Sequence, residues 1–147
     1  MSHASRRLAG FLLVVFPTVI FGGVSLLSFL VNDPAYKENA LRQDLWRAGH
    51  AHAGVLLVLS LVLLRYVDEA RLGRVATGVA RHAVPAAAIL IPAAFFLSVP
   101  TPASTEPNAL IWLAPLGAVS LVTGLVTLGV GLLRARTDRS VESVTVH

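Results

Sequence analysis

The chain contains no cysteine, and its single methionine is residue 1. The absence of cysteine excludes disulfide bonds, thiolate metal ligands and cysteine nucleophiles together. Charged residues are also scarce, at 14% of 147 residues, whereas hydrophobic residues make up 55%. A soluble domain of this size keeps a large share of its surface exposed and could not bury so much apolar area. The composition therefore indicates a protein that lies in lipid.

Sequence motifs for catalysis are missing as well. The chain has no Walker loop, no GxSxG elbow, no HExxH pair and no paired carboxylates within an apolar stretch. We therefore expect no catalytic residues and no covalent chemistry. The excess of 12 Lys and Arg over 8 Asp and Glu could suggest nucleic acid. These cations lie in short segments between apolar runs, so they indicate membrane topology, and no nucleic-acid partner is expected.

Four apolar stretches are long enough to cross a bilayer, whose hydrocarbon core takes ~20 residues of helix. They cover residues 8–31, 47–66, 82–100 and 108–133. Each must be helical, because a lone strand would leave backbone N–H and C=O groups unpaired in lipid. The predicted fold is an all-α integral membrane protein, in which residues 1–147 form one domain and four helices make an antiparallel up-down bundle.

The second stretch is the shortest of the four. Trp46 and Tyr66 lie at its two ends, and 20 residues of helix span about 30 Å. Aromatic side chains favour the two membrane interfaces, and Arg47 and Arg65 can extend outward beside them. We therefore count this stretch as a complete span.

The distribution of cations predicts the orientation of the chain. Nine of the twelve lie in the N-terminal segment, the second connection and the C-terminal segment, whereas Lys37, Arg42 and Arg47 lie in the first connection. The positive-inside rule places the nine, and with them both termini, in the cytoplasm. The expected location is the cell membrane, with multiple spans. Export signals have a shorter apolar run and a small-residue cleavage site, so the first span is expected to stay uncleaved.

The connections carry a few local signals. Asp33-Pro34 is typical of a helix start, with Asp as N-cap and Pro at the first position. The following residues, up to 47, predict a short interfacial helix or an outward extension of the second span. Gly73 is a candidate C-cap for the second helix. The polar residues 135–147 are expected to form a disordered tail.

Two histidines in the run from Arg47 to Gly54 are the best candidates for chemistry. His50 and His52 lie just inside Trp46, where an ionisable side chain in lipid indicates a functional site. On a regular helix they point about 160° apart, so they cannot both bind one ion. Arg47, His50 and Gly54 share one face, which could bind an anion or line a polar pocket. His50 is our choice for the interior.

Cofactor and partner predictions follow from this run. The default interpretation is that the histidines lie among lipid headgroups and that no cofactor is bound. The alternatives are a proton relay, or a haem or transition metal held by His50 or His52 with ligands from elsewhere.

Small and hydroxyl residues mark the last span. Such residues let membrane helices approach closely and hydrogen-bond to one another. We predict a helix-packing face made of Gly117, Ser120, Thr123, Gly124, Thr127 and Gly131. The first span has a similar set in Gly22, Ser25 and Ser28, so the first and last spans are expected to be neighbours.

These observations favour a small polytopic membrane protein that acts by packing or binding. It could be an accessory subunit of a larger membrane complex or a protein that associates with itself, and its surroundings are the lipid bilayer. One alternative is an oligomeric channel or proton-coupled transporter with Arg47 and His50 at its outer mouth. The other is a haem- or metal-binding membrane protein.

Overall fold

The structure is a computed structural model that describes residues 1–144, with side chains for residues 1–135. Every element in this part of the chain is a helix. The elements are α1 (His3–Asn32), α2 (Pro34–Glu38), α3 (Ala40–Val67), α4 (Arg74–Ser98), the 3₁₀ turn η1 (Ala109–Trp112) and α5 (Leu113–Val144). Four segments are long and apolar enough to cross a membrane: His3–Asn32, Ala40–Val67, Arg74–Ser98 and Ala109–Ala135.

Side-chain caps begin the first three helices. The Ser2 hydroxyl accepts from the Ser5 N–H of α1, and the Asp33 carboxylate accepts from the first N–H groups of α2, with Pro34 at the first position. Asn39 caps α3 by accepting from the Arg42 N–H. Such caps satisfy donors that a helix start leaves unpaired. The helix start predicted at Asp33-Pro34 is confirmed.

Two local predictions are wrong. Gly73 precedes Arg74 as the N-cap of α4, and the α3 helix ends earlier, at Val67. The helix α5 continues to Val144, whereas a disordered tail was expected from residue 135. Residues 145–147 of that predicted tail lie outside the described part of the chain. For residues 35–47 the sequence predicted either a short helix or an outward extension of the second span, and both occur. The short helix α2 comes first, and α3 then begins at Ala40, before the predicted start at residue 47.

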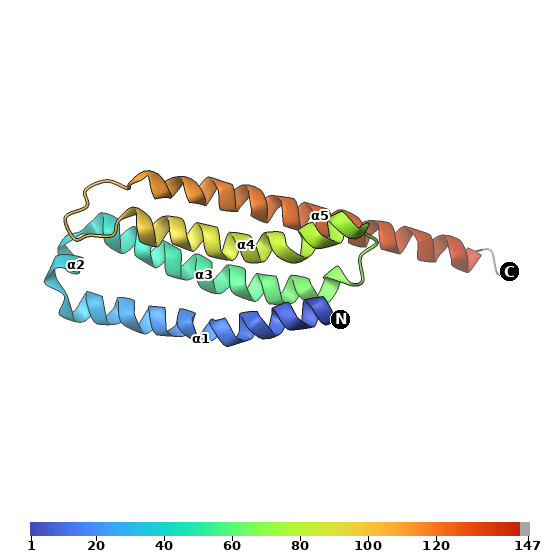
Figure 1. Cartoon of the computed structure of the whole chain (residues 1–147), viewed down its shortest axis with the longest axis horizontal. Coiled ribbons are helices and arrows are strands. Elements are labelled where there is room, and N and C mark those ends of the chain that lie inside the picture. The colour runs from blue at the N-terminus through green and yellow to red at the C-terminus, as the bar shows by residue number, and fades with distance from the viewer. Residues whose placement is uncertain (145–147) are drawn as a thin grey trace.

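The four long helices lie side by side in the order α1, α3, α4, α5 (Figure 1). The most extensive packing is between α4 and α5, followed by α3 with α4, and α1 packs mainly on α3. The predicted contact between the first and last spans is therefore wrong. Within the described residues α1 and α5 are the two edges of a layer, whereas a closed four-helix bundle would bring them together.

Three apolar clusters connect the layer. Leu12 of α1 packs with Leu57 and Leu64 of α3. The other two clusters join α3 to α4, and then α3 and α4 to α5, through Leu56, Ala87 and Ile91 and through Val67, Ala80 and Leu128. Only Ser5 and Leu12 are buried in α1, so its surface is almost entirely outside the protein interior.

Glycines bring α5 close to α4. A Cβ on Gly117 would lie 2.6 Å from an Ile91 side-chain carbon, and one on Gly124 would lie 3.0 Å from both Ala83 and Val84. The separation at Gly117 is too short for a side chain unless something shifts, and that at Gly124 is tighter than ordinary contact, so both glycines favour the close approach. Ser120 adds a hydrogen bond of 2.8 Å from its hydroxyl to the Ala83 carbonyl.

Of the remaining residues of the predicted packing face, two lie at least partly inside the layer and one lies outside it. Gly131 is buried against Leu72, which lies in the connection between α3 and α4. Thr127 is half-buried. Thr123 is exposed and donates to the Val119 carbonyl of its own helix, so it lies outside the α4–α5 interface. A helical repeat of three and four residues explains this, because residue 123 points away from the face shared by 117, 120 and 124.

We predict that Gly124→Leu destabilises the protein by about 1–3 kcal/mol, because the new side chain would overpack the α4–α5 contact. The measurement is the unfolding midpoint in mild detergent. Gly129→Leu is the matched control, since a Cβ there meets no atom within 4 Å. Val126→Leu, at a position 59% exposed, should also have little effect. Equal losses in Gly124→Leu and Gly129→Leu would contradict the assigned interface.

Candidate functional site

A polar network joins the first turn of α1 to the connection between α3 and α4. The Ser2 N–H donates to the Asp68 carboxylate at 2.6 Å, and the Ser5 hydroxyl donates to the same carboxylate at 3.3 Å. Arg81 donates to the Ser5 hydroxyl at 3.2 Å and pairs with Asp68 at 3.4 Å. The Arg81 and Asp68 side chains are only 17% and 21% exposed. We call these four residues the polar clasp.

Electrostatics keep the clasp carboxylate ionised. Burial would raise the pKa of Asp68, but the hydrogen bonds from Ser2 and Ser5 and the Arg81 guanidinium outweigh it and hold that pKa below 3.8. The charge of Asp68 in turn offsets the charge of Arg81. The clasp is therefore a neutral, hydrogen-bonded contact between three helices.

Beyond the clasp, α1 and α4 separate, and a lateral groove lies between them. Its volume is about 560 Å³. The walls and floor come from Leu8, Phe11, Leu12, Val15, Thr18 and Val19 of α1, from His82, Pro85, Ala86, Ala88 and Ile89 of α4, and from Ala53 and Leu57 of α3. These residues are mostly apolar, and the volume lies in the range of ~300–1,000 Å³ that is typical of small-ligand sites.

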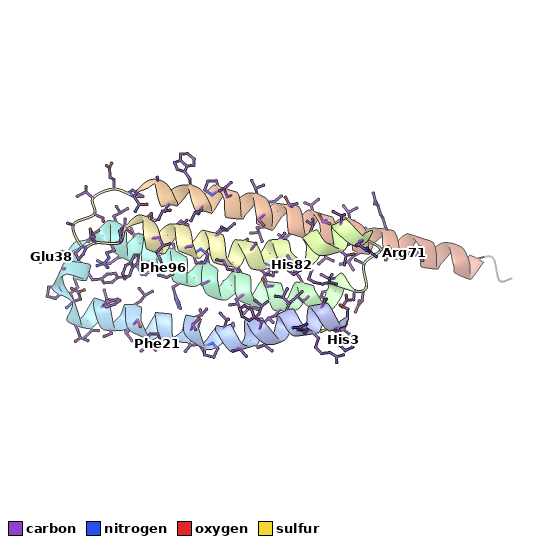
Figure 2. The ribbon with its side chains drawn as sticks, in the orientation of Figure 1. His3, Phe21, Glu38, Arg71, His82 and Phe96 are labelled. Atoms are coloured by element: carbon purple, nitrogen blue, oxygen red, sulfur yellow. The ribbon has the colours of Figure 1, made fainter. Side chains whose placement is uncertain are left out.

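The polar groups of the lateral groove are few. Thr18 donates its hydroxyl hydrogen to the Val15 carbonyl of its own helix at 2.7 Å. His82 is exposed and lies one residue after the clasp arginine, in the half of α4 nearer the start of α1 (Figure 2). The groove thus has an imidazole at one end and apolar walls along its length.

The structure does not bring the predicted site residues into one pocket. Arg47 pairs with Asp44 at 2.8 Å, and both side chains are well exposed. Arg47 lines a small depression with Leu26 and Tyr36. His50 lines a different crevice of about 410 Å³ between α1 and α3. Arg47 and His50 share a face of α3, but their side chains line different hollows against α1.

His50 packs against two glycines of α1. A Cβ on Gly23 would lie 3.0 Å from ring atoms of His50, and one on Gly22 would lie 3.8 Å from Nδ1. The small residues of the first span therefore receive an α3 side chain, which explains why they do not contact α5. The imidazole is half-buried on the α1 side of the layer.

His52 lies on the other side of α3. Its side chain is exposed, its Nδ1 is 2.7 Å from the Ala48 carbonyl oxygen, and its ring lies 5.3 Å from that of Phe95. Of the two histidines, His50 therefore faces α1 and His52 faces α4. Within residues 1–135, no three His, Cys, Asp or Glu side chains come together as metal ligands do.

Sequence reasoning missed an aromatic cluster at the end of the layer opposite the clasp. Trp46 contacts Phe29 of α1, Tyr36 of α2 and Phe96 of α4, with ring centroids about 6 Å apart. The Arg42 guanidinium lies 4.0 Å from the Trp46 ring and donates to the Pro100 carbonyl at 3.3 Å. Trp46 was predicted as an interfacial anchor only, and its ring partners are far from it in sequence, so no local pattern indicated the cluster.

No family model matches this chain, and no curated protein or solved structure matches it. The lateral groove and the polar clasp therefore carry the functional argument on their own chemistry.

We predict that Asp68→Ala destabilises the protein by about 1–3 kcal/mol at pH 7, because Arg81 and Ser2 lose their shared acceptor. The folded-state pKa is lowered, so the contribution of the carboxylate is present above about pH 4 and is lost as the pH falls through the native pKa. The difference in unfolding free energy between wild type and Asp68→Ala, measured in detergent, should therefore be smaller at pH 3 than at pH 7.

The control for this prediction is Asp44→Ala. Asp44 makes an exposed ion pair with Arg47 at the other end of the layer, and such pairs contribute about 0–1 kcal/mol. Two results would show that the clasp carboxylate does not hold α1. One is a destabilisation by Asp68→Ala that does not change with pH, and the other is an equal loss of unfolding free energy in Asp44→Ala.

Proposed function

We propose that this is a multi-pass cell-membrane protein that binds an apolar molecule in the lateral groove and catalyses no covalent reaction. The observation that carries the proposal is the groove itself, about 560 Å³ lined by three apolar helices. A site of this kind, reached sideways from the bilayer, suits a ligand that is dissolved in lipid.

The lining supports binding over catalysis. Among the groove residues, His82 is the one ionisable side chain, and Thr18 gives its hydroxyl hydrogen to its own helix. A nucleophile needs an adjacent base, and acid–base work needs a second positioned group. The described lining offers apolar contact area and one imidazole, which fits recognition.

The proposed topology has four antiparallel spans with both termini in the cytoplasm. The clasp supports it, because hydrogen bonds from Ser2 and Ser5 to Asp68 hold the start of α1 beside the end of α3. Arg6 and Arg7 therefore share one end of the layer with Arg65, Arg71 and Arg74, and a concentration of cations is typical of the cytoplasmic side. At the opposite end, Asn39 donates to the Pro102 and Ser104 carbonyls.

A second candidate is association with another membrane helix, either a second copy or the subunit of a larger complex. The side of α1 away from α3 favours it, because Val14 is 78% exposed and Phe21, labelled in Figure 2, is 73% exposed. This surface lies outside the groove, so the two candidates use different parts of α1.

We predict from the topology that cysteine introduced at Ser104 reacts with an impermeant thiol reagent in intact cells, whereas cysteine at Ser140 does not. The native chain has no cysteine, so all labelling reports the introduced thiol. Lysed cells provide the control, since both positions should then react. The reverse pattern in intact cells would overturn the orientation.

We predict that Ala86→Phe abolishes binding in the groove, because its ring would occupy space between α1 and α4. Native mass spectrometry of protein released from nanodiscs should show a bound lipid-derived molecule on wild type, and at least fivefold less of it on Ala86→Phe. Ala118→Phe places the same ring on an exposed surface of α5 and should retain the molecule.

Two results would contradict groove binding. One is equal retention by Ala86→Phe and wild type, and the other is no bound molecule on wild type.

A further inference from the structure

We infer that the lateral groove holds one acyl chain of an anionic phospholipid from the cytoplasmic leaflet, with its phosphate beside His82 and Arg7. This inference rests on the proposed function and adds the class of ligand and the residues that select it. Three features support it: the size of the groove, its depth in the membrane and the charge at its cytoplasmic end.

The size of the groove suits one hydrocarbon chain. The α1 wall runs from Leu8 to Val19, which is about 16 Å of helix. Over that length the groove offers about 560 Å³ between α1 and α4. A single hydrocarbon chain is narrow and flexible, and it suits a groove of this volume.

The depth matches one leaflet. Leu8 begins the predicted first span of residues 8–31, and Val19 lies near its midpoint. A groove of about 16 Å therefore covers about half of the ~30 Å hydrocarbon core. A molecule that spans the membrane would extend past Val19. A lipid of the cytoplasmic leaflet has its headgroup at the level of Leu8 and His82 and its chain end near the midplane.

The polar clasp lies beyond one end of the groove. Arg81 donates to the Ser5 hydroxyl there, which joins α4 to α1 one residue before His82. Because α1 and α4 are joined at this end, we expect the occupant to enter sideways from the bilayer. A lipid fits this geometry because its headgroup stays at the interface while its chain moves laterally into the groove.

The charge at this end favours a phosphate. Arg81 is already offset by Asp68, but Arg7 and His82 are exposed, and among residues 1–135 neither makes an ion pair. Arg7 immediately precedes the groove residue Leu8 and lies one turn from Phe11, so it is on the flank of the α1 wall. A guanidinium and an imidazole N–H are both donors to phosphate oxygens. An anionic headgroup adds net charge attraction that a zwitterionic one lacks.

The test compares headgroups with identical acyl chains. Full-length protein is placed in nanodiscs of equal phosphatidylglycerol and phosphatidylcholine, and the lipid retained after release is identified by native mass spectrometry. Each cation near the surface contributes about fivefold to the affinity for an anionic lipid. Wild type should therefore retain mainly phosphatidylglycerol. The double variant Arg7→Gln/His82→Gln should lose that preference at least fivefold and still retain one lipid.

Control variants separate this site from general surface attraction. Arg47→Gln removes one exposed cation at the opposite end of the layer and should keep the wild-type preference. His82→Gln alone should reduce the preference by less than the double variant does. Arg7 and His82 are both exposed, so these substitutions should leave the fold intact. Circular dichroism checks that the helices remain.

The outcomes distinguish this inference from the proposed function. If wild type retains a lipid that Ala86→Phe loses, but shows no preference for phosphatidylglycerol, groove binding stands and the anionic-lipid inference is overturned. The same holds if Arg47→Gln lowers the preference as much as Arg7→Gln/His82→Gln does. If no lipid is retained in either membrane, both the inference and the proposed function fail.

Discussion

The pairing of Asp68 with Arg81 through the hydroxyls and N–H of the first turn determines where α1 lies. These groups come from three helices, and each is partly withdrawn from water. The Arg81 side chain is only 17% exposed, so removal of its acceptor would leave a partly buried cation unpaired, which is destabilising. The start of α1 is thereby held against α3 and α4, although α1 has few buried residues of its own.

The two edge helices of the layer differ in how they pack. Gly117 and Gly124 let α5 approach α4 to within ordinary side-chain contact along its length. In α1, Gly22 and Gly23 lie in the second half of the helix and receive His50, whereas a Cβ on Gly10 would meet nothing within 4 Å. The helix α5 therefore approaches α4 closely at several positions, whereas α1 approaches α3 closely around Gly22 and Gly23. In lipid, where apolar surface gains little by leaving the solvent, this distribution of small residues decides which helices fit tightly.

Much of the secondary structure could be predicted from the sequence, because it depends on local rules. The absence of charge over long stretches predicts the spans, and Asp33-Pro34 predicts the start of α2. The opposite directions of His50 and His52 also follow from the helical repeat alone. Each of these predictions uses residues that are close together in the chain.

The order of the helices could not be predicted in this way. Glycine and serine on the first span were interpreted as a contact with the last span, but a small-residue face can receive any bulky neighbour, and here it receives His50. Arg42 was counted only as a loop cation, because the sequence left the start of this helix open. In the structure α3 begins at Ala40, so Arg42 and Trp46 lie one turn apart on the same helix and stack. The lateral groove has no sequence signal, since its residues are ordinary leucines, valines and alanines of three helices.

The groove follows from two attachments of α1, between which α1 packs on α3 but not on α4. At one end, the clasp joins Ser5 to Arg81, and at the other, Phe29 packs against Tyr36 and Trp46 at ring distances of 5.9 Å. Between these attachments α1 rests on α3 and leaves α4, and Pro17 removes one backbone hydrogen bond from this stretch. A helix fixed at both ends cannot move aside to close the space against α4. The space between α1 and α4 therefore stays open along the side of the layer.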